Sequence, residues 1–206
     1  MRCGRWQGKR TRGCSDMVLA TSGGRAAVFL DRDGVLNQAV VRDGRPFPPA
    51  AVGEVVIPAG VREACRLLSD AGLLLVGVTN QPDIARGATS RHAVDAINGY
   101  LRRELDLDAV YVCPHDDGDA CGCRKPAPGL LLEAAADWDV DLTRSVMVGD
   151  RWRDVDAGRR AGVTTVWLRR DYREPPPDAP DHVVDHLVDV VPLVVASATA
   201  GEGSRR

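Results

Sequence analysis

The chain has 206 residues, of which 44% are hydrophobic, and a formal net charge of −2 at pH 7. This length and apolar content suit one domain with a substantial core. No stretch is long and apolar enough to span a bilayer, and the first residues lack the continuous apolar segment of a secretory signal. These features argue against an integral membrane protein and predict a cytoplasmic one with no membrane partner.

The small net charge conceals a basic N-terminal segment, because residues 1–25 carry six Lys or Arg and a single Asp. Such a leader could contact nucleic acid or an acidic surface. Its composition is more typical of a disordered extension without a partner, and Met17 offers a second possible translation start. We therefore expect a disordered leader over 1–25, a folded domain over 26–196 and a disordered tail over 197–206, with no nucleic-acid partner.

Short apolar runs alternate with segments of helical periodicity along the folded domain. Residues 26–30 are one such run, and it stops at a cluster of charge, as a buried parallel strand does at the edge of a sheet. Residues 37–56 contain a turn signal followed by prolines, which predicts an irregular stretch. The expected strands cover 26–30, 73–78, 109–112, 145–148 and 163–168, and the expected helices cover 60–71, 90–105, 128–138 and 150–161.

This alternation predicts right-handed βαβ units and a parallel sheet that is covered on both faces. The fold class is therefore α/β, with the three-layer α/β/α arrangement of a Rossmann-like domain. Ligands of such sheets bind at the carboxyl ends of the strands. The polar residues that fall at those ends are Asp31, Asp33, Thr79, Asn80 and Asp150.

Asp31 and Asp33 are the candidate catalytic pair. They follow a strand directly and can face one pocket if the backbone turns, although such a pair can also be a helix cap and a solvated charge. Asp31 can attack phosphorus and form an acyl phosphate, while Asp33 first protonates the leaving alkoxide and then activates water. Two neighbouring carboxylates favour this division of roles, because like charges raise the pKa of one of them.

An anionic nucleophile approaches an anionic phosphate only with a cation between them, and magnesium with one or two carboxylate ligands meets that need. Asp150 ends another strand and is the natural second ligand beside Asp31, although a helix N-cap is the alternative for it. The Thr79 hydroxyl can donate to a phosphoryl oxygen, and Lys125 can supply a fixed positive charge, although a lysine is usually only solvated.

The six cysteines are too few and too unevenly spaced for a secreted disulfide framework. Three of them and one histidine fall within eleven residues, on a loop whose glycines permit tight bends. This set matches a closed, structural zinc site of the Cys3His kind, which would hold the loop that presents Arg124 and Lys125 to the phosphate. A strained local disulfide and simple buried cysteines are the alternatives. The predicted ligands are Cys113, His115, Cys121 and Cys123.

The assembled motifs resemble the haloacid dehalogenase (HAD) superfamily of phosphatases over roughly residues 26–170. Its four signatures occur in order, as Asp31-Arg32-Asp33-Gly34, Thr79-Asn80-Gln81, Arg124-Lys125-Pro126, and Gly149-Asp150 followed by Asp154.

The resemblance implies a role for each matching residue. Asp31 would be the nucleophile and a magnesium ligand, Asp33 the acid/base that also lends its backbone carbonyl to the metal, and Asp150 the remaining protein ligand. The residues that bind phosphate or substrate would be Thr79, Asn80, Arg124 and Lys125.

The zinc loop narrows the resemblance to the branch of heptose bisphosphate phosphatases and histidinol-phosphate phosphatases, which lacks a large cap domain. Residues 81–87 look closer to the heptose enzymes, although Pro82-Asp83 replaces their usual Ser-Gly and Val35 replaces a common threonine. The expected substrate is D-glycero-D-manno-heptose 1,7-bisphosphate, which would lose its 7-phosphate to a monomeric enzyme. Histidinol phosphate, another sugar phosphate and a nucleotide-sugar pathway intermediate are the rival substrates.

A receiver-like signalling domain is the remote alternative of another class, because it also joins a phosphorylatable Asp with Thr and Lys on a parallel sheet. There the acidic pair precedes the phosphoacceptor strand, whereas here Asp33 follows Asp31, where a hydrolytic acid/base is needed. An inactive scaffold held by zinc is disfavoured by the complete catalytic set.

Overall fold

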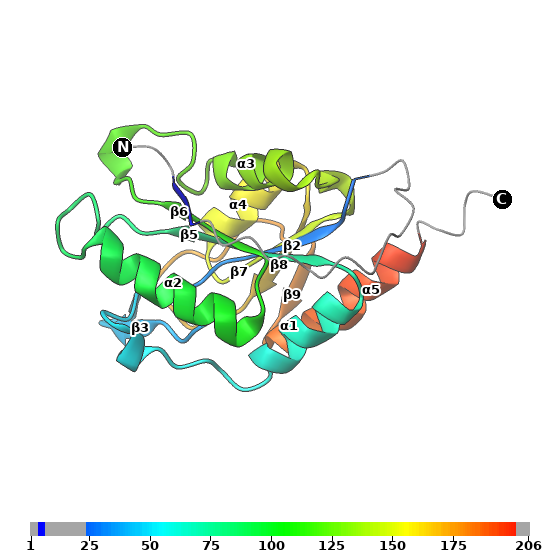
Figure 1. The fold of residues 1–206 in the computed structure, drawn as a ribbon, viewed down its shortest axis with the longest axis horizontal. Coiled ribbons are helices and arrows are strands. Elements are labelled where there is room, and N and C mark those ends of the chain that lie inside the picture. The colour runs from blue at the N-terminus through cyan, green and yellow to red at the C-terminus, as the bar shows by residue number, and fades with distance from the viewer. Residues whose placement is uncertain (1–3, 7–23, 201–206) are drawn as a thin grey trace.

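A computed structural model describes residues 4–6 and 24–200, and the side chains of 24–195. Seven strands form one sheet in the order β1-β6-β5-β2-β7-β8-β9 (Figure 1). Six of them run parallel, and β1 is antiparallel to β6. The strands are β1 Gly4–Trp6, β2 Ala27–Leu30, β5 Leu74–Asn80, β6 Ala109–Cys113, β7 Val146–Gly149, β8 Thr164–Leu168 and β9 His182–Val184.

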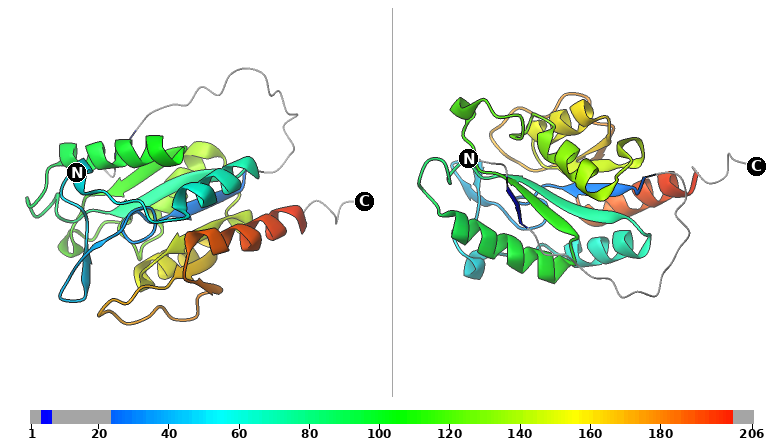
Figure 2. Two further views of the ribbon diagram at one scale, coloured as in Figure 1. Left: turned by 90° about the horizontal axis from the view of Figure 1, so that it is seen from below. Right: turned by 45° about the horizontal axis from the view of Figure 1, so that its top comes forward.

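Helices cover both faces of the sheet, which confirms the three-layer α/β/α prediction. Figure 2 shows α1, α2 and α5 on one face and α3 and α4 on the other. The pleat of the strands divides the core accordingly, because Val28 and Leu30 of β2 pack toward the first group and Ala27 and Phe29 toward the second. The helices are α1 Val61–Asp70, α2 Arg91–Leu105, α3 Gly129–Trp138, α4 Trp152–Ala161 and α5 Val190–Ala200, with short 3-10 turns at Val52–Glu54, Asp117–Asp119, Leu142–Arg144 and Leu187–Asp189.

The five predicted strands and four predicted helices are all present, within one or two residues at most ends. Local chemistry accounts for their limits. The Ser90 side chain accepts a hydrogen bond from the amide of Ala93 at 3.1 Å and so caps α2, while Gly162 ends α4 in the left-handed conformation. Within the described residues, no helix combines the length and the apolarity that a bilayer crossing requires.

The stretch 37–56, expected to be irregular, contains a hairpin of β3 Val40–Arg42 and β4 Arg45–Phe47. Asp43 and Gly44 both have positive φ, at 49° and 74°, which is the backbone of the tight turn that suits a two-residue hairpin loop. Pro46 is tolerated because each strand of a two-stranded sheet is an edge strand. The expectation was therefore wrong for the hairpin, since the turn signal outweighed the prolines.

The structure also departs from the expected termini. Within the leader that we expected to be disordered, residues 4–6 form β1, which pairs with the otherwise free edge of β6. Strand β9 and helix α5 were not predicted, and α5 runs to Ala200, beyond the expected start of the tail at 197. The expectations for 7–23, including a start at Met17, and for 201–206 fall outside the described residues.

Candidate active site

The predicted catalytic residues meet at the carboxyl edge of the sheet. Strands β5, β2 and β7 are neighbours, so the residues that end them converge. Carboxylate oxygens of Asp31, Asp150 and Asp154 lie within 4.8 Å of one another, and all three residues are buried. Two stretches about 120 residues apart in the sequence thus supply one cluster of carboxylates, as expected for residues at the carboxyl ends of neighbouring parallel strands.

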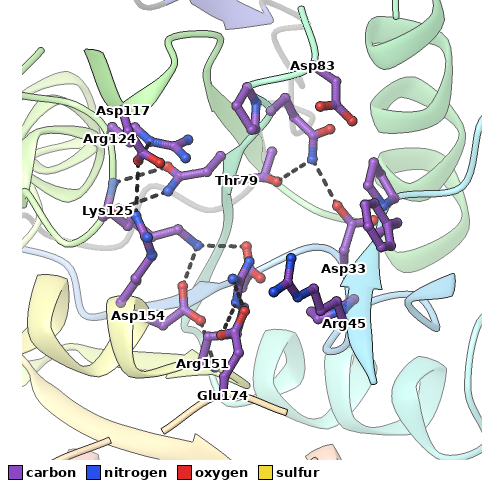
Figure 3. Close-up of a pocket in the computed structure, with 18 of the residues that line it drawn as sticks. Asp33, Arg45, Thr79, Asp83, Asp117, Arg124, Lys125, Arg151, Asp154 and Glu174 are labelled. Carbon is purple, nitrogen blue, oxygen red and sulfur yellow. Dashed lines mark hydrogen bonds and ion pairs between the residues drawn. The ribbon is translucent and has the colours of Figure 1, made fainter. Parts of the chain in front are cut away.

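Lys125 is in direct contact with two members of this cluster. Its Nζ donates to Asp31 Oδ1 at 2.6 Å and to the Val78 carbonyl at 2.9 Å, and it lies 2.5 Å from Asp154 Oδ1 (Figure 3). Burial alone would lower the pKa of Lys125, but the charges of Asp154 and Asp31 outweigh burial and raise it. The lysine is therefore a fixed positive charge beside the proposed nucleophile.

The acid cluster carries more negative charge than Lys125 offsets. Burial raises the pKa of Asp31 to about 6, against the pull of Lys125, and the nearby Asp154 carboxylate adds to the rise. Burial, followed by the charges of Asp31 and Asp154, raises the pKa of Asp150 well above its usual range. Three carboxylates that face one another out of water favour a cation among them.

Asp150 supplies a direct test of whether a metal ion fits. Its Oδ2 accepts a hydrogen bond from the Tyr172 hydroxyl at 2.8 Å, whereas its Oδ1 is buried and has no hydrogen-bond partner. A buried, unpaired carboxylate oxygen is costly unless a ligand completes it. The oxygen donors around it are of the kind that magnesium prefers, so the residues fit a hard divalent cation. Tyr172 was missed in the sequence because it lies in an irregular segment beyond the matching motifs.

Gly34 explains the close approach of two loops at this point. Its φ is 97°, and a Cβ there would lie 1.7 Å from Asp150 Oδ2. Only glycine leaves room for the Asp150 carboxylate against the turn that follows Asp33.

Asp33 lies at the pocket but is held apart from the acid cluster by its own donors. Arg32 Nη2 donates to it at 2.8 Å, Asn37 Nδ2 at 3.0 Å and Gln81 Nε2 at 2.9 Å. Arg32 is 1% exposed and also donates to Asn98 Oδ1 on α2. These donors fix the orientation of the proposed acid/base. The sequence indicates Gln81 only as part of a motif, and it does not indicate Asn98, which lies within a helical pattern.

The sequence marks Asp154 only as part of the fourth motif, without a function of its own. It lies in the first turn of α4, where it accepts a hydrogen bond from the Arg151 amide at 3.0 Å and pairs with Lys125. Its position four residues after Asp150, at the start of a helix, was the available signal. The pairing with Lys125 depends on the tertiary fold.

Thr79 and Asn80 end β5 and line the pocket. Gln81 Nε2 donates to the Thr79 hydroxyl oxygen at 2.9 Å, which leaves the hydroxyl hydrogen available for a phosphoryl oxygen. Asn80 bonds twice to the backbone of Lys125, at 3.0 and 3.1 Å. Its amide therefore positions the Lys125 backbone, and the expected contact of Asn80 with phosphate or substrate stays a prediction.

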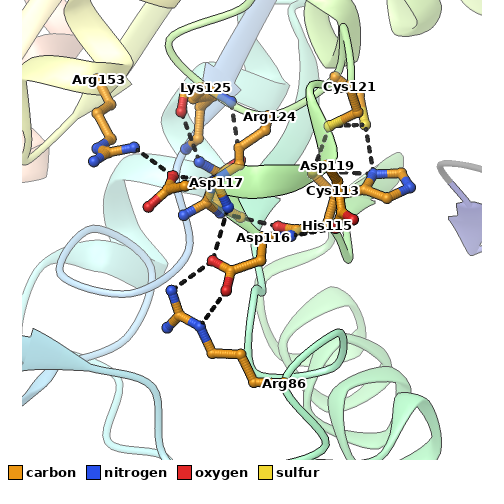
Figure 4. A network of polar contacts seen from close by, with 12 residues as sticks. Arg86, Cys113, His115, Asp116, Asp117, Asp119, Cys121, Arg124, Lys125 and Arg153 are labelled. Carbon is orange, nitrogen blue, oxygen red and sulfur yellow. Dashed lines mark hydrogen bonds and ion pairs between the residues drawn. The ribbon is translucent and has the colours of Figure 1, made fainter.

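Cys113, His115, Cys121 and Cys123 form a second cluster, beside the pocket (Figure 4). Sulfur atoms of Cys113 and Cys123 lie 3.6 Å from that of Cys121, and His115 Nδ1 lies 3.6 and 3.4 Å from Cys113 and Cys123. Tetrahedral zinc with Zn–S bonds of about 2.3 Å implies sulfur separations of about 3.8 Å, so the spacing fits. Cys113 and Cys121 are free thiols, whereas Cys123 is disulfide-bonded, so its service as a zinc ligand requires the reduced protein.

The loop that carries this cluster also organises the arginines of the pocket. Asp117 accepts from Arg124 at 2.8 Å and from Arg153 at 3.2 Å, and Asp116 pairs with Arg86 (Figure 4). The arginine pairing lowers the pKa of Asp116 to about 2. Order in the loop is thus transmitted to cations that face the pocket.

The pocket itself has a volume of about 420 Å³ and opens over Asp31, Asp33 and Lys125. This size suits a small metabolite. Its walls come from the β3–β4 hairpin, the turn after β5, the cysteine loop, the start of α4 and residues 173–174. No inserted domain covers it within the described residues.

Known proteins resemble both the sequence and this geometry. A HAD-hydrolase-like family model matches residues 122–190. The D-glycero-beta-D-manno-heptose-1,7-bisphosphate 7-phosphatase of Haemophilus ducreyi is 37% identical over 186 residues, which cover 83% of this chain and 99% of that protein. The protein of the same name from Escherichia coli K12 is 35% identical over 179 residues, which cover 80% and 91%.

A solved structure agrees with these relatives. The D,D-heptose 1,7-bisphosphate phosphatase of B. bronchiseptica, complexed with magnesium and phosphate, matches with a TM-score of 0.72 at 31% identity, over 83% of this chain and 98% of that one. The parallel sheet and its strand-end carboxylates therefore define a HAD-type phosphatase, a phosphoric monoester hydrolase. Within that class, the chain belongs to the D-glycero-β-D-manno-heptose-1,7-bisphosphate 7-phosphatase family.

Proposed function

We propose that the protein removes the 7-phosphate of D-glycero-β-D-manno-heptose 1,7-bisphosphate in a magnesium-dependent reaction through an aspartyl phosphate on Asp31. The observation that carries the proposal is the buried cluster of Asp31, Asp150 and Asp154, with one unpartnered carboxylate oxygen, beside Lys125. The aligned residues of this chain cover nearly the whole length of the relatives that have this substrate in their names. This coverage supports the choice of sugar.

The reaction divides into two displacements at phosphorus. In the first, an oxygen of Asp31 attacks phosphorus, the bond from phosphorus to the sugar oxygen breaks, and Asp33 gives its proton to that oxygen. In the second, Asp33 takes a proton from water, the water oxygen attacks the acyl phosphate, and the bond to Asp31 breaks to release phosphate. Asp33 can serve in both steps because each returns it to the form that the other needs.

The proposed magnesium ligands are the side chains of Asp31 and Asp150 and the backbone carbonyl of Asp33. When bound, the ion lowers the repulsion between Asp31 and the phosphate and stabilises the charge of the transferring group. The positive charge of Lys125 stabilises the same phosphoryl oxygens, and the Thr79 hydroxyl donates a hydrogen bond to one of them. Arg124 faces the substrate from the cysteine loop, and Asn80 acts through the backbone of Lys125.

The Cys113, His115, Cys121 and Cys123 set is proposed to hold a structural zinc ion. All four positions of a tetrahedral ion would be filled by protein, which leaves none for substrate. Its contribution would be to keep Asp116 and Asp117 in place for the pocket arginines. We further propose that the enzyme is a cytoplasmic monomer, and that it has no nucleic-acid partner.

The test is release of inorganic phosphate from heptose 1,7-bisphosphate and from histidinol phosphate, side by side, with and without Mg²⁺. We expect hydrolysis of the bisphosphate at the 7-position, dependence on Mg²⁺ and a much lower kcat/KM for histidinol phosphate. Preferred hydrolysis of histidinol phosphate would overturn the sugar assignment. A stable phosphoprotein without turnover would overturn the phosphatase assignment in favour of a phosphoacceptor domain.

A further inference from the structure

The arginines that line the pocket are not equivalent. Four of the six are paired with acidic side chains, namely Arg86 with Asp83 and Asp116, Arg124 and Arg153 with Asp117, and Arg151 with Glu174. Arg45 and Arg173 also line it, and within the described residues neither guanidinium has an ion pair or a hydrogen bond. The positive charge of the pocket that is not neutralised by protein therefore lies at these two residues.

The two unpaired arginines come from segments outside the phosphatase motifs. Arg45 begins β4 of the hairpin, and Arg173 follows β8 in an irregular segment. Figure 3 shows Arg45 directed into the pocket, on the side opposite Arg124 and Asp117. Thr79, in β5, and Lys125, on the loop that precedes α3, are the residues proposed to face the reacting phosphate. The free positive charge thus comes from segments other than those that carry the reacting residues.

Arg45 and Arg173 form one wall of the pocket, and contacts that do not use their guanidinium groups hold the backbone of this wall in place. The Arg173 amide donates to the Gly44 carbonyl at 2.7 Å, and a Cβ on Gly44 would lie 2.6 Å from Arg173 Cγ. The Gln38 amide donates to the Val56 carbonyl at 2.8 Å and closes the base of the hairpin segment. The ion pair between Glu174 and Arg151 fixes the residue next to Arg173. Two guanidiniums are thus presented by anchored backbone, which reduces the ordering cost of binding an anion.

We propose that Arg45, with Arg173 beside it, binds the second phosphate of the substrate, the one that is not hydrolysed. A planar guanidinium donates two parallel hydrogen bonds to a phosphate, and unpaired arginines are free to do so. The inference rests on the proposed function, since it assigns the recognition of a bisphosphate to the same pocket. It makes the hairpin a determinant of specificity for substrates with an anionic group on the leaving alcohol.

The test compares two substrates that share the scissile group, heptose 1,7-bisphosphate and heptose 7-phosphate. Arg45→Ala is expected to raise KM for the bisphosphate by about tenfold to a hundredfold, as loss of a charge-assisted contact implies, with less than about a twofold change for the monophosphate. Arg45→Lys should recover part of the difference, because it restores the charge without the planar donor pair. Arg173→Ala should show the same selectivity with a smaller effect.

Arg42→Ala is the matched control, because it removes a charge from the same hairpin at a position that does not line the pocket. Thermal unfolding of every variant establishes that the fold is kept. Equal changes of KM for both substrates, or an effect of Arg42→Ala as large as that of Arg45→Ala, would overturn the second-phosphate assignment while the phosphatase activity stands. Failure of the unchanged protein to hydrolyse either sugar phosphate would instead overturn the proposed function, and this inference with it.

Free phosphate as the ligand of Arg45 is a separate outcome of the same experiment. If Arg45 binds free phosphate, the inhibition constant of inorganic phosphate would differ between the wild-type protein and Arg45→Ala even with the monophosphate as substrate. We expect no such difference, because the wall is built to bind a phosphate tethered to a sugar whose other phosphate lies at Asp31.

Discussion

The two candidate metal-binding clusters of this protein are assembled in opposite ways. The cysteine loop places all its ligands within eleven residues, whereas the acid cluster joins Asp31 to two residues more than 110 positions later. The acid cluster is buried beneath an open pocket, and the cysteine cluster would be closed by its own ligands. A structural metal can be held by one loop, but chemistry needs groups from several strand ends around one space. Changes to the first cluster should therefore act indirectly, and changes to the second should stop the reaction.

The sharpest contrast is expected from Asp31→Asn. It removes the proposed nucleophile with almost no change of volume, so kcat should fall by at least about 10³-fold. The metal-free variant should be no less stable than the unchanged protein at pH 7.5, because one charge leaves a repulsive cluster. Phosphate release and thermal unfolding measure the two effects. Normal turnover by this variant would exclude Asp31 as the nucleophile.

Loss of the zinc ligands should have an intermediate effect. Cys121→Ser in the reduced protein should abolish stoichiometric zinc and lower kcat/KM by about tenfold to a hundredfold, because Asp117 no longer holds Arg124 and Arg153. Metal analysis and steady-state kinetics provide the measurement. Cys65→Ser is the control, since Cys65 of α1 is buried in the half of the core on the opposite face of the sheet from Cys113 and Cys123. A folded, reduced protein without zinc would refute the zinc site.

Tyr172→Phe separates positioning from catalysis within the acid cluster. The variant keeps the ring but removes the donor to Asp150 Oδ2, so the Mg²⁺ concentration for half-maximal activity should rise by about tenfold. The kcat at saturating Mg²⁺ should change little. Titration of the protein with Mg²⁺, followed by thermal unfolding, gives a reading that does not depend on turnover. An unchanged Mg²⁺ requirement would show that Asp150 needs no orientation from this hydroxyl.

The smallest expected effect is a pH dependence of the stabilisation of the folded protein by Mg²⁺. The pKa of Asp31 is raised from 3.8 to about 6 in the folded protein, so its contribution to stability is full below pH 3.8 and is lost as the pH rises through 6. Mg²⁺ binds the ionised carboxylates and should therefore raise the melting temperature more at pH 7.5 than at pH 5, by a few degrees. The same titration on Asp31→Asn is the control, and an equal Mg²⁺ effect at both pH values would contradict the assignment.

The sequence by itself determined the main elements of the domain and indicated which acids gather at the strand ends. Each buried strand is a short apolar run, and the acids that follow two of these runs are visible because strand ends in parallel sheets share one edge. The four proposed zinc ligands stand out equally in the sequence because they lie in one short loop, and the structure brings them together. The β3–β4 hairpin is also indicated by Asp43-Gly44, a turn signal that outweighs Pro46 because β4 is an edge strand.

Only the tertiary structure decided which side chains form hydrogen bonds and ion pairs with the candidate catalytic residues. The Asn80 side chain bonds to the backbone of Lys125, and α4 brings the Asp154 carboxylate to Nζ of that lysine. Tyr172 reaches the acid cluster and Arg45 reaches the pocket, each from an irregular or edge segment whose local sequence has no periodicity to interpret. Such contacts join residues far apart in the chain, and their energies depend on packing and burial that no local pattern records.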